Sequence, residues 1–183
     1  MTSSLFHSAG FSQPYANPFD SERLTPEERR RGEFIHRVLA LIEYNEYIEY
    51  MDEGFGEWVL EVIRQVSDEM RADYNPQELK EIILGILGHG EVKEFFARRP
   101  GREVWREREF VNAEGRLFRM DRVVTDRDRV VLLDWKTGKD QDAEKEHEAQ
   151  MRTYLEILEE IYPGKSLEGW IVYVDLKNVR RIH

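Results

Sequence analysis

The sequence contains no cysteine among its 183 residues. This absence excludes disulfides, thiolate zinc sites, iron–sulfur clusters and cysteine nucleophiles in one step. Any metal ion that the protein binds must therefore be held by oxygen atoms and imidazole nitrogens.

Long apolar runs are missing as well. No stretch approaches the roughly 20 consecutive apolar residues that a membrane-spanning helix needs. The amino-terminal stretch MTSSLFHSAGFSQPY lacks the basic and apolar regions of a secretory signal. Hydrophobic residues make up 40% of the chain and charged residues 35%, as in ordinary soluble globular proteins. We therefore expect a cytoplasmic protein without a membrane partner.

The chain also lacks an excess of positive charge, because its formal net charge is −10. This total argues at first sight against a polyanionic partner, since non-specific nucleic-acid binding depends on Lys and Arg neutralising phosphates. The charges are unevenly distributed, however. Acidic residues predominate over residues 43–81, where a solvated face is the simpler interpretation, and basic residues predominate over residues 98–139. A local basic cluster can receive an anion whatever the total charge.

Two regions differ in their residue pattern. Residues 1–24 are rich in Ser, Pro, Asn and Gly without a sustained period, which indicates a flexible leader or linker. Residues 25–183 are expected to form a single domain, since their number suits one hydrophobic core. Within it we expect a helical part over residues 25–99 and a sheet part that carries the catalytic residues over residues 100–183.

The helical part begins at a recognisable start signal. Thr25, Pro26 and Glu28 form the pattern of a capping box with proline at the first helical position. Apolar residues then recur at helical spacing. Further helices are predicted over residues 56–71, 76–87 and 91–99, with Gly88 ending the third.

After Pro100 the pattern changes to short β-like runs. Turn-forming segments, NAEG and TDRD, separate three of them, which predicts a three-stranded antiparallel meander. A helix over residues 142–161 is expected to cross over to a later strand. The predicted strands cover residues 102–111, 116–124, 129–136, 169–176 and a short 179–183. The expected fold class is α/β, with a mixed β-sheet built from the antiparallel meander plus a crossover strand, and an N-terminal helical region.

The stretch VVLLDWKTGK, residues 130–139, carries the chemistry. Asp134 and Lys136 project to the same side of an extended strand because side chains alternate. Asp121 lies near the end of the preceding strand, and antiparallel pairing brings it within several ångströms of Asp134. Two adjacent carboxylates repel unless a cation lies between them. A hard divalent ion such as Mg²⁺ prefers such oxygen ligands.

Lys136 cannot bind a cation as an ammonium, but it can position or deprotonate a water or neutralise charge on a phosphate. The alternative is a surface ion pair at a strand end, with Asp121 unrelated. The preceding apolar run, the following Thr-Gly turn and the upstream aspartate favour the functional interpretation. The TGK at 137–139 is not a nucleotide-binding phosphate loop, because Leu133 stands where the loop needs glycine.

The segments RMDRVV, VVLLDWKTGK and EAQMRTY resemble, in this order, the RecB-like branch of the PD-(D/E)xK nuclease superfamily. The resemblance implies a restriction-endonuclease-like core and covers the chain from about residue 25 onward. It implies Asp121 and Asp134 as metal ligands and Lys136 as the residue that acts on the attacking water. Gln150 and Tyr154, spaced to share one helix face, are then expected to reach the active-site cleft.

Other site residues follow from the same resemblance. The segment RRGEFIHRVL implies His36 as a further metal ligand, although from its position alone a half-buried helix histidine is the simpler interpretation. The carbonyl of Trp135 is implied as another ligand. The segment REREF implies Glu107 near the site, with Glu109 as the alternative. His147, on the helix face of Gln150, is not assigned to the site.

A basic group on the meander is a candidate phosphate track, although a solvated hairpin also explains it. Arg119 stands where the family often has glycine, beside the site. The residues that we expect to contact DNA are Arg119, Arg122 and Lys139, and the wider group includes Arg127 and Arg129.

The resemblance implies a metal-dependent DNA nuclease that uses Mg²⁺ or Mn²⁺, with no iron–sulfur cluster and no nucleotide. The expected reaction is phosphodiester hydrolysis on single-stranded DNA or duplex ends. The closest likeness is to the nuclease module of UvrD/Rep-type and AddA-type helicase-nucleases, with the motor in cis or in trans, in DNA repair or recombination. The alternative is a catalytically inactive DNA-binding or helicase-docking module of the same fold.

Overall fold

The computed structural model describes residues 24–44, 53–112, 115–138 and 143–182. Residues 1–23 of the expected leader lie outside this part of the chain. The elements in chain order are α1 (Pro26–Leu41), α2 (Glu53–Met70), α3 (Pro76–Leu87), the 3₁₀ helix η1 (Lys93–Phe96), β1 (Glu103–Val111), β2 (Leu117–Thr125), β3 (Arg129–Lys136), α4 (Glu144–Ile161), β4 (Ser166–Tyr173) and β5 (Asn178–Ile182).

The predicted fold class is confirmed: helices precede a mixed sheet of the restriction-endonuclease-like kind. The start signal of α1 works as the sequence suggests, because the Thr25 hydroxyl accepts from the Glu28 N–H and the Glu28 carboxylate accepts from the Thr25 N–H. Element ends differ by a few residues. The second helix begins at Glu53 instead of 56, and β4 begins at Ser166 instead of 169. In the described part of the chain, no helix has the length and apolar character that a bilayer crossing requires.

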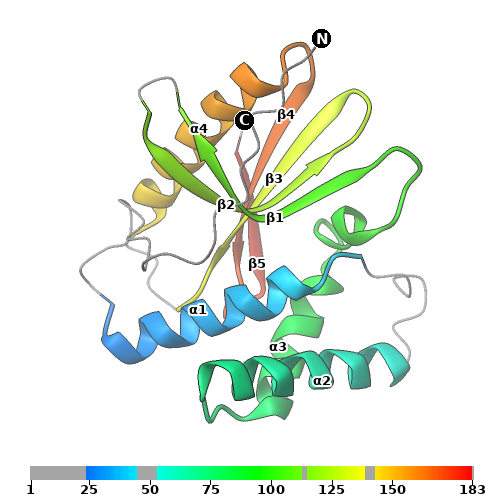
Figure 1. The fold of residues 1–183 in the computed structure, drawn as a ribbon, viewed down its shortest axis with the longest axis vertical. Coiled ribbons are helices and arrows are strands. Elements are labelled where there is room, and N and C mark those ends of the chain that lie inside the picture. The colour runs from blue at the N-terminus through cyan, green and yellow to red at the C-terminus, as the bar shows by residue number, and fades with distance from the viewer. Residues whose placement is uncertain (1–23, 45–52, 113–114, 139–142, 183) are drawn as a thin grey trace.

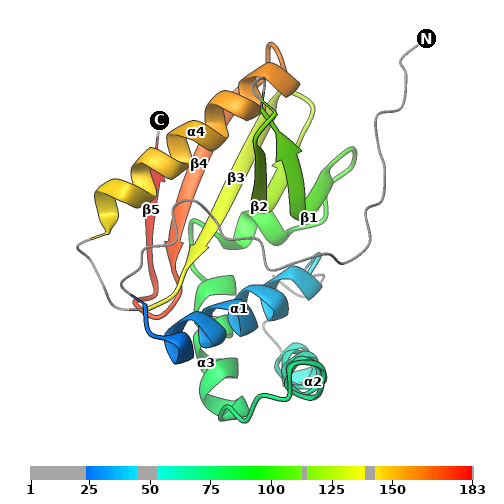
Figure 2. The same cartoon turned by 60° about the vertical axis from the view of Figure 1, so that its left-hand side comes forward.

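The sheet has the strand order β1-β2-β3-β4-β5. The strands β1, β2 and β3 form the predicted antiparallel meander, and β4 pairs parallel to β3. Parallel neighbours need a crossover connection, which α4 provides by running along one side of the sheet (Figures 1 and 2). This topology brings the ends of β3 and β4 beside the start of α4.

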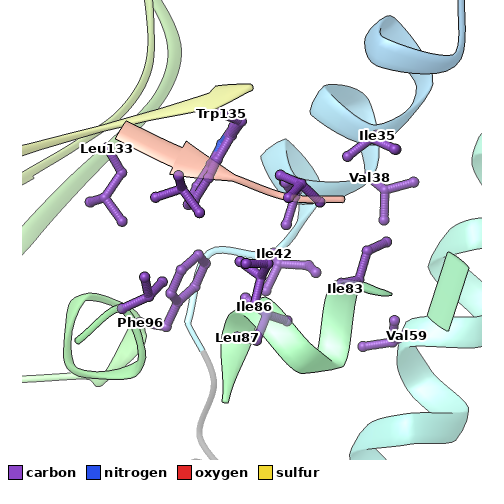
Figure 3. Close-up of a cluster of buried hydrophobic side chains, with 14 of the residues drawn as sticks. Ile35, Val38, Ile42, Val59, Ile83, Ile86, Leu87, Phe96, Leu133 and Trp135 are labelled. Atoms are coloured by element: carbon purple, nitrogen blue, oxygen red, sulfur yellow. The ribbon is translucent and has the colours of Figure 1, made fainter. Parts of the chain in front are cut away.

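Two apolar clusters hold the layers together. The larger one lies between α1, α2, α3 and one face of the sheet, where Leu133 and Trp135 of β3 meet Phe96, Ile42 and Ile86 (Figure 3). The smaller one lies between α4 and the opposite face. The strand β3 is therefore covered on both faces, and Asp134 is a buried carboxylate that follows four buried apolar residues.

The far end of the β2–β3 hairpin is fixed by a buried arginine. The Arg102 side chain donates to both carboxylate oxygens of Asp126 at 2.7 Å, and to the carbonyls of Glu94 at 2.7 Å and Ala97 at 3.0 Å. Hydrogen bonds from Arg102 and Arg129 outweigh burial and lower the pKa of Asp126 to about 2. The ionised Asp126 therefore stabilises the fold.

We predict that Asp126→Asn lowers the free energy of unfolding by about 3 kcal/mol at neutral pH, because the buried guanidinium loses its counter-ion. The stabilisation is complete above the ordinary aspartate pKa of about 4 and is lost as the pH falls toward 2. Urea unfolding of the unaltered protein and of Asp126→Asn between pH 7 and pH 2.5 measures the difference in their free energies of unfolding. If the difference between them does not narrow below about pH 4, the charge of Asp126 is not what stabilises this end.

Candidate active site

The ladder between β1 and β2 is interrupted at one row. Regular pairs flank it at Arg106↔Arg122 and Arg108↔Met120, which leaves Glu107 opposite Asp121 between them. The β2–β3 pairing ends at Arg122↔Leu133, and one step further along this register stands Asp121 opposite Asp134. The predicted proximity of the two aspartates therefore has a geometric basis, and Glu107 joins them on a third strand.

The backbone of Glu107 explains the interruption. Its φ of 50° lies in the left-handed region, which is costly for a residue with a Cβ. The alternation of side chains shifts by one here, because Trp105 and Phe110 both pack toward α4 although they are five positions apart, which in a regular strand would put them on opposite faces. The strand thus changes face at the acidic row, and strain of this kind concentrates at functional sites.

Asp121 joins two strands and a helix. Its Oδ2 accepts a hydrogen bond of 2.8 Å from the backbone N–H of Trp135. Its Oδ1 lies 3.1 Å from Nδ1 of His36 on α1. The carboxylate is buried, so these two contacts replace the water that it loses on folding.

Glu107 completes a group of three possible metal ligands. The imidazole and carboxylate atoms of His36, Glu107 and Asp121 all lie within 4.8 Å of one another. Glu107 Oε2 is 3.2 Å from the Arg119 guanidinium, and its Oε1 is 4.0 Å from His36 Nδ1. Oε1 is buried and accepts no hydrogen bond from any described residue. A buried anionic oxygen without a donor fits a bound cation.

Lys136 lies on the same face of β3 as Asp134 and reaches α4. Its ammonium is 2.8 Å from Asp134 Oδ2 and donates to Gln150 Oε1 at 2.6 Å. The Gln150 amide in turn donates to the Tyr154 hydroxyl at 2.8 Å. The structure thus brings Gln150 to Lys136 and Tyr154 to Gln150, and this chain of contacts fixes the orientation of the Gln150 amide.

The electrostatics of the acidic row differ from residue to residue. Burial by itself raises the pKa of Asp121, but His36, Lys136 and the Trp135 N–H together hold it below its usual value. Burial and the charge of Asp121 raise the pKa of Asp134 against the opposing effect of Lys136. Burial and Asp121 also raise the pKa of Glu107. Crowded carboxylates of this kind favour either a proton or a cation between them.

In His36 the effect of burial on the pKa has the opposite sign to that in the carboxylates. Burial alone lowers the pKa of the imidazole, but the negative charges of Asp121, Glu107 and Asp134 outweigh burial and raise it. The imidazole is therefore tied to the carboxylates and is not an isolated core histidine. One imidazole nitrogen and two carboxylate oxygens suit a divalent cation such as Mg²⁺ or Mn²⁺, so the residues fit the metal that the resemblance implies.

The prediction that Arg122 contacts DNA is wrong. Its side chain is 1% exposed and lies on the face of the sheet that α1 and η1 cover. The guanidinium donates to the carbonyls of Ile42, Glu43 and Phe95 and lies 3.8 Å from the Phe96 ring centroid. Arg122 therefore holds the end of α1 and η1 against the sheet and has no access to a phosphate.

The other expected residues differ in their surroundings. Arg119 is 42% exposed beside Glu107. Lys139 lies outside the described residues. Arg129 is ion-paired with Asp126 and Glu94 at the opposite end of the strands, where the exposed Arg127 also lies.

Two metal ligands expected on β3 do not belong to the group of three. The Trp135 side chain is in the core, and Asp134 is held by Lys136. The backbone carbonyl of Trp135 and the carboxylate of Asp134 stay predicted ligands.

Tyr173 is a neighbour of the site that the sequence did not suggest. It is the partner of Lys136 in the β3–β4 register, and its hydroxyl is 3.4 Å from Nδ1 of His147 on α4. An aromatic residue in an apolar strand gives no local signal of such a position. His147, on α4, therefore contacts the residue that pairs with Lys136 in the sheet.

A comparison with known protein families gives a match over most of the chain. The family described as the PD-(D/E)XK nuclease superfamily matches residues 13–182. The comparison with curated proteins gives no match. Among solved structures the chain is similar to the crystal structure of SSO0001, with 15% sequence identity and a TM-score of 0.30, over 87% of this chain and 77% of that chain.

We predict that Glu107→Gln weakens Mn²⁺ binding, measured by titration calorimetry on metal-free protein. Loss of a residue that merely supports a ligand costs about 10–100-fold in metal affinity, so loss of a ligand should cost at least about tenfold. Glu109→Gln is the matched control, because Glu109 is on the same strand and exposed. Equal affinities for the two variants would show that Glu107 is not a ligand.

Proposed function

The chain belongs to the PD-(D/E)XK nuclease superfamily, and from this premise we propose that it is a Mg²⁺- or Mn²⁺-dependent deoxyribonuclease that hydrolyses phosphodiester bonds. One observation carries the proposal: His36, Glu107 and Asp121 converge from a helix and two strands on a space within 4.8 Å. The ion pair of Lys136 with Asp134 lies in the adjoining strand. Superfamily members are metal-dependent nucleases, so the same groups have a chemical purpose here.

We propose His36, Glu107, Asp121 and Asp134 as side-chain ligands of the cation, with the Trp135 carbonyl as a further ligand. A divalent cation bound there supplies Lewis-acid polarisation of the scissile phosphodiester. The buried Asp121 orients the imidazole through their 3.1 Å contact. The Trp135 N–H fixes the other oxygen of Asp121, so the carboxylate cannot rotate freely.

Lys136 is the proposed residue that acts on the attacking water. An ammonium has three N–H donors, and among the described residues Asp134 and Gln150 engage it from two directions. The remaining donor can hold a water or a phosphate oxygen. Gln150 and Tyr154 keep the ammonium in place, which is the role that we assign to them.

We further propose that the chain is the nuclease module of a UvrD/Rep-type or AddA-type helicase-nuclease that acts in DNA repair or recombination. The support is the order of the sequence segments RMDRVV, VVLLDWKTGK and EAQMRTY. DNA, as single strands or duplex ends, is the proposed substrate, and a motor in cis or in trans is the proposed partner.

We predict that Lys136→Met lowers the rate of DNA cleavage in Mg²⁺ or Mn²⁺ by at least about 100-fold, the usual contribution of a proton-transfer group. Asp134→Asn should lower the rate as well, because it removes a proposed ligand of the cation that polarises the phosphodiester. EDTA should abolish cleavage by the unaltered protein. Lys80→Met is the matched control, because Lys80 has the same 16% exposure and an ion pair of 3.1 Å, with Glu57, between α2 and α3. Unaltered protein that binds DNA without cutting it in either metal would favour the inactive binding module.

We also predict that Arg119→Ala weakens DNA binding several-fold in EDTA, because an exposed arginine beside the site can neutralise one phosphate. The slope of log affinity against log salt should become shallower by about 1. Fluorescence anisotropy with a labelled duplex measures both. Arg64→Ala, at an exposed, ion-paired arginine of α2, should change neither, and an equal effect of the two variants would remove Arg119 from the interface.

A further inference from the structure

Asp175, which follows β4, joins three segments of the chain. Its carboxylate accepts two hydrogen bonds from the Arg31 guanidinium of α1, at 2.6 and 3.0 Å. It also accepts a 2.6 Å hydrogen bond from the backbone N–H of Gly138, in the loop after β3. The Asp175 side chain is 8% exposed. We call Arg31, Gly138 and Asp175 the α1 clamp.

The clamp lies between two parts of the proposed active site. Arg31 precedes His36 by five residues on α1, a rise of about 7.5 Å along the helix. Gly138 follows Lys136 by two residues, and the Lys136 carbonyl accepts from the Val174 N–H at 2.9 Å, next to Asp175. One carboxylate thus connects the helix that carries the imidazole to the strand end that carries the lysine.

The packing at the clamp leaves little room for adjustment. A Cβ added to Gly32 would lie 2.7 Å from Oγ1 of Thr137. The backbone of α1 therefore approaches Thr137 at a distance that leaves no room for a side chain at position 32. Gly138 adopts a φ of 91°, which residues with a Cβ rarely adopt. Thr137 therefore lies close against Gly32, and the next residue, Gly138, is bonded to Asp175.

The clamp is also a stronger tie than the ion pair that Arg37, further along α1, forms with Glu69. Bidentate arginine–carboxylate pairs fix geometry as well as distance. The Arg37–Glu69 pair, by contrast, joins side chains that are 42% and 40% exposed at 3.3 Å, and such surface pairs contribute little. Loss of the clamp should therefore change how α1 lies against the end of β3.

We propose that Arg31 and Asp175 are positioning residues of the metal site, which keep His36 at its distance from Asp121 and Glu107. The proposal rests on the proposed function for the identity of the ligands, and it assigns the clamp no contact with metal or DNA. Its effect reaches the site through the position of α1.

The test is Mn²⁺ binding by titration calorimetry on metal-free protein, together with kcat and KM for DNA cleavage. Asp175→Asn should weaken Mn²⁺ binding by about 10–100-fold, the usual effect of residues that orient metal ligands, and should lower kcat more than KM. Asp126→Asn is the matched control. It removes the charge from an equally bidentate arginine pair at the other end of the hairpin, so it reduces stability without moving His36.

A double-mutant comparison tests the route through His36. In a His36→Ala background, Asp175→Asn should cause less than a twofold further loss of Mn²⁺ affinity, because the ligand that it positions is gone. A full additional loss in that background would overturn the proposal. So would an Asp175→Asn protein that matches the Asp126→Asn protein in Mn²⁺ affinity.

A second pair of variants addresses the same contact without the ion pair, should Asp175→Asn fail to fold. Gly32→Ala should weaken Mn²⁺ binding by pushing α1 away from Thr137. Adding Thr137→Ala removes Oγ1 and leaves only Cβ, at 3.9 Å, so the double variant should return to the affinity of Thr137→Ala alone. Absence of any effect of Gly32→Ala would overturn the proposal.

The outcomes separate the two proposals. Unaltered protein that binds Mn²⁺ but never cuts DNA refutes the proposed function, and the affinities still decide the role of the clamp. If the unaltered protein binds no Mn²⁺, the proposal that Arg31 and Asp175 position a metal ligand is refuted.

Discussion

The site depends on one buried carboxylate. Asp121 accepts the backbone N–H of Trp135 with one oxygen and faces His36 with the other, so a strand, its neighbour and a helix meet at a single side chain. A carboxylate without partners in this position would be strongly unfavourable. The contacts that satisfy it are also those that orient the imidazole and end the regular pairing of β2 with β3. Stability and the arrangement of the proposed ligands therefore have the same origin.

The fold accepts strain at the same row. Glu107 has a left-handed backbone between two regular pairs of the β1–β2 ladder. The left-handed backbone reverses the alternation of side chains along the strand. The Glu107 carboxylate lies with His36 and Asp121 at this point. Its Oε1 is left buried without a donor among the described residues. Local rules are broken where a ligand is expected, which is the pattern of functional sites in otherwise consistent sequences.

Much of this arrangement follows from the sequence because it is encoded locally. The capping box at Thr25, the turns of the meander and the i, i+2 relation of Asp134 and Lys136 each depend on a few adjacent residues. Arg122 was misassigned for a different reason. It pairs with Leu133 and alternates with Asp121, so it faces away from the site, and the coverage of that face by α1 and η1 depends on distant segments of the chain. The clamp is equally hidden. Arg31 lies in the segment RRGEFIHRVL, but nothing in that segment points to Asp175, 144 residues further along the chain.

The basic cluster over residues 98–139 has a different meaning in three dimensions. Arg102 and Arg122 are buried and donate to backbone carbonyls, and Arg106 donates to the carbonyl of Ala40 and pairs with Glu43. Arg129 is held by Asp126 and Glu94. Arginines that bind the protein itself cannot release counterions from DNA. Arg119, beside Glu107, is one residue of this cluster that stays exposed. Several members of the basic cluster therefore serve the fold, and charge counted along the sequence does not by itself predict a phosphate track.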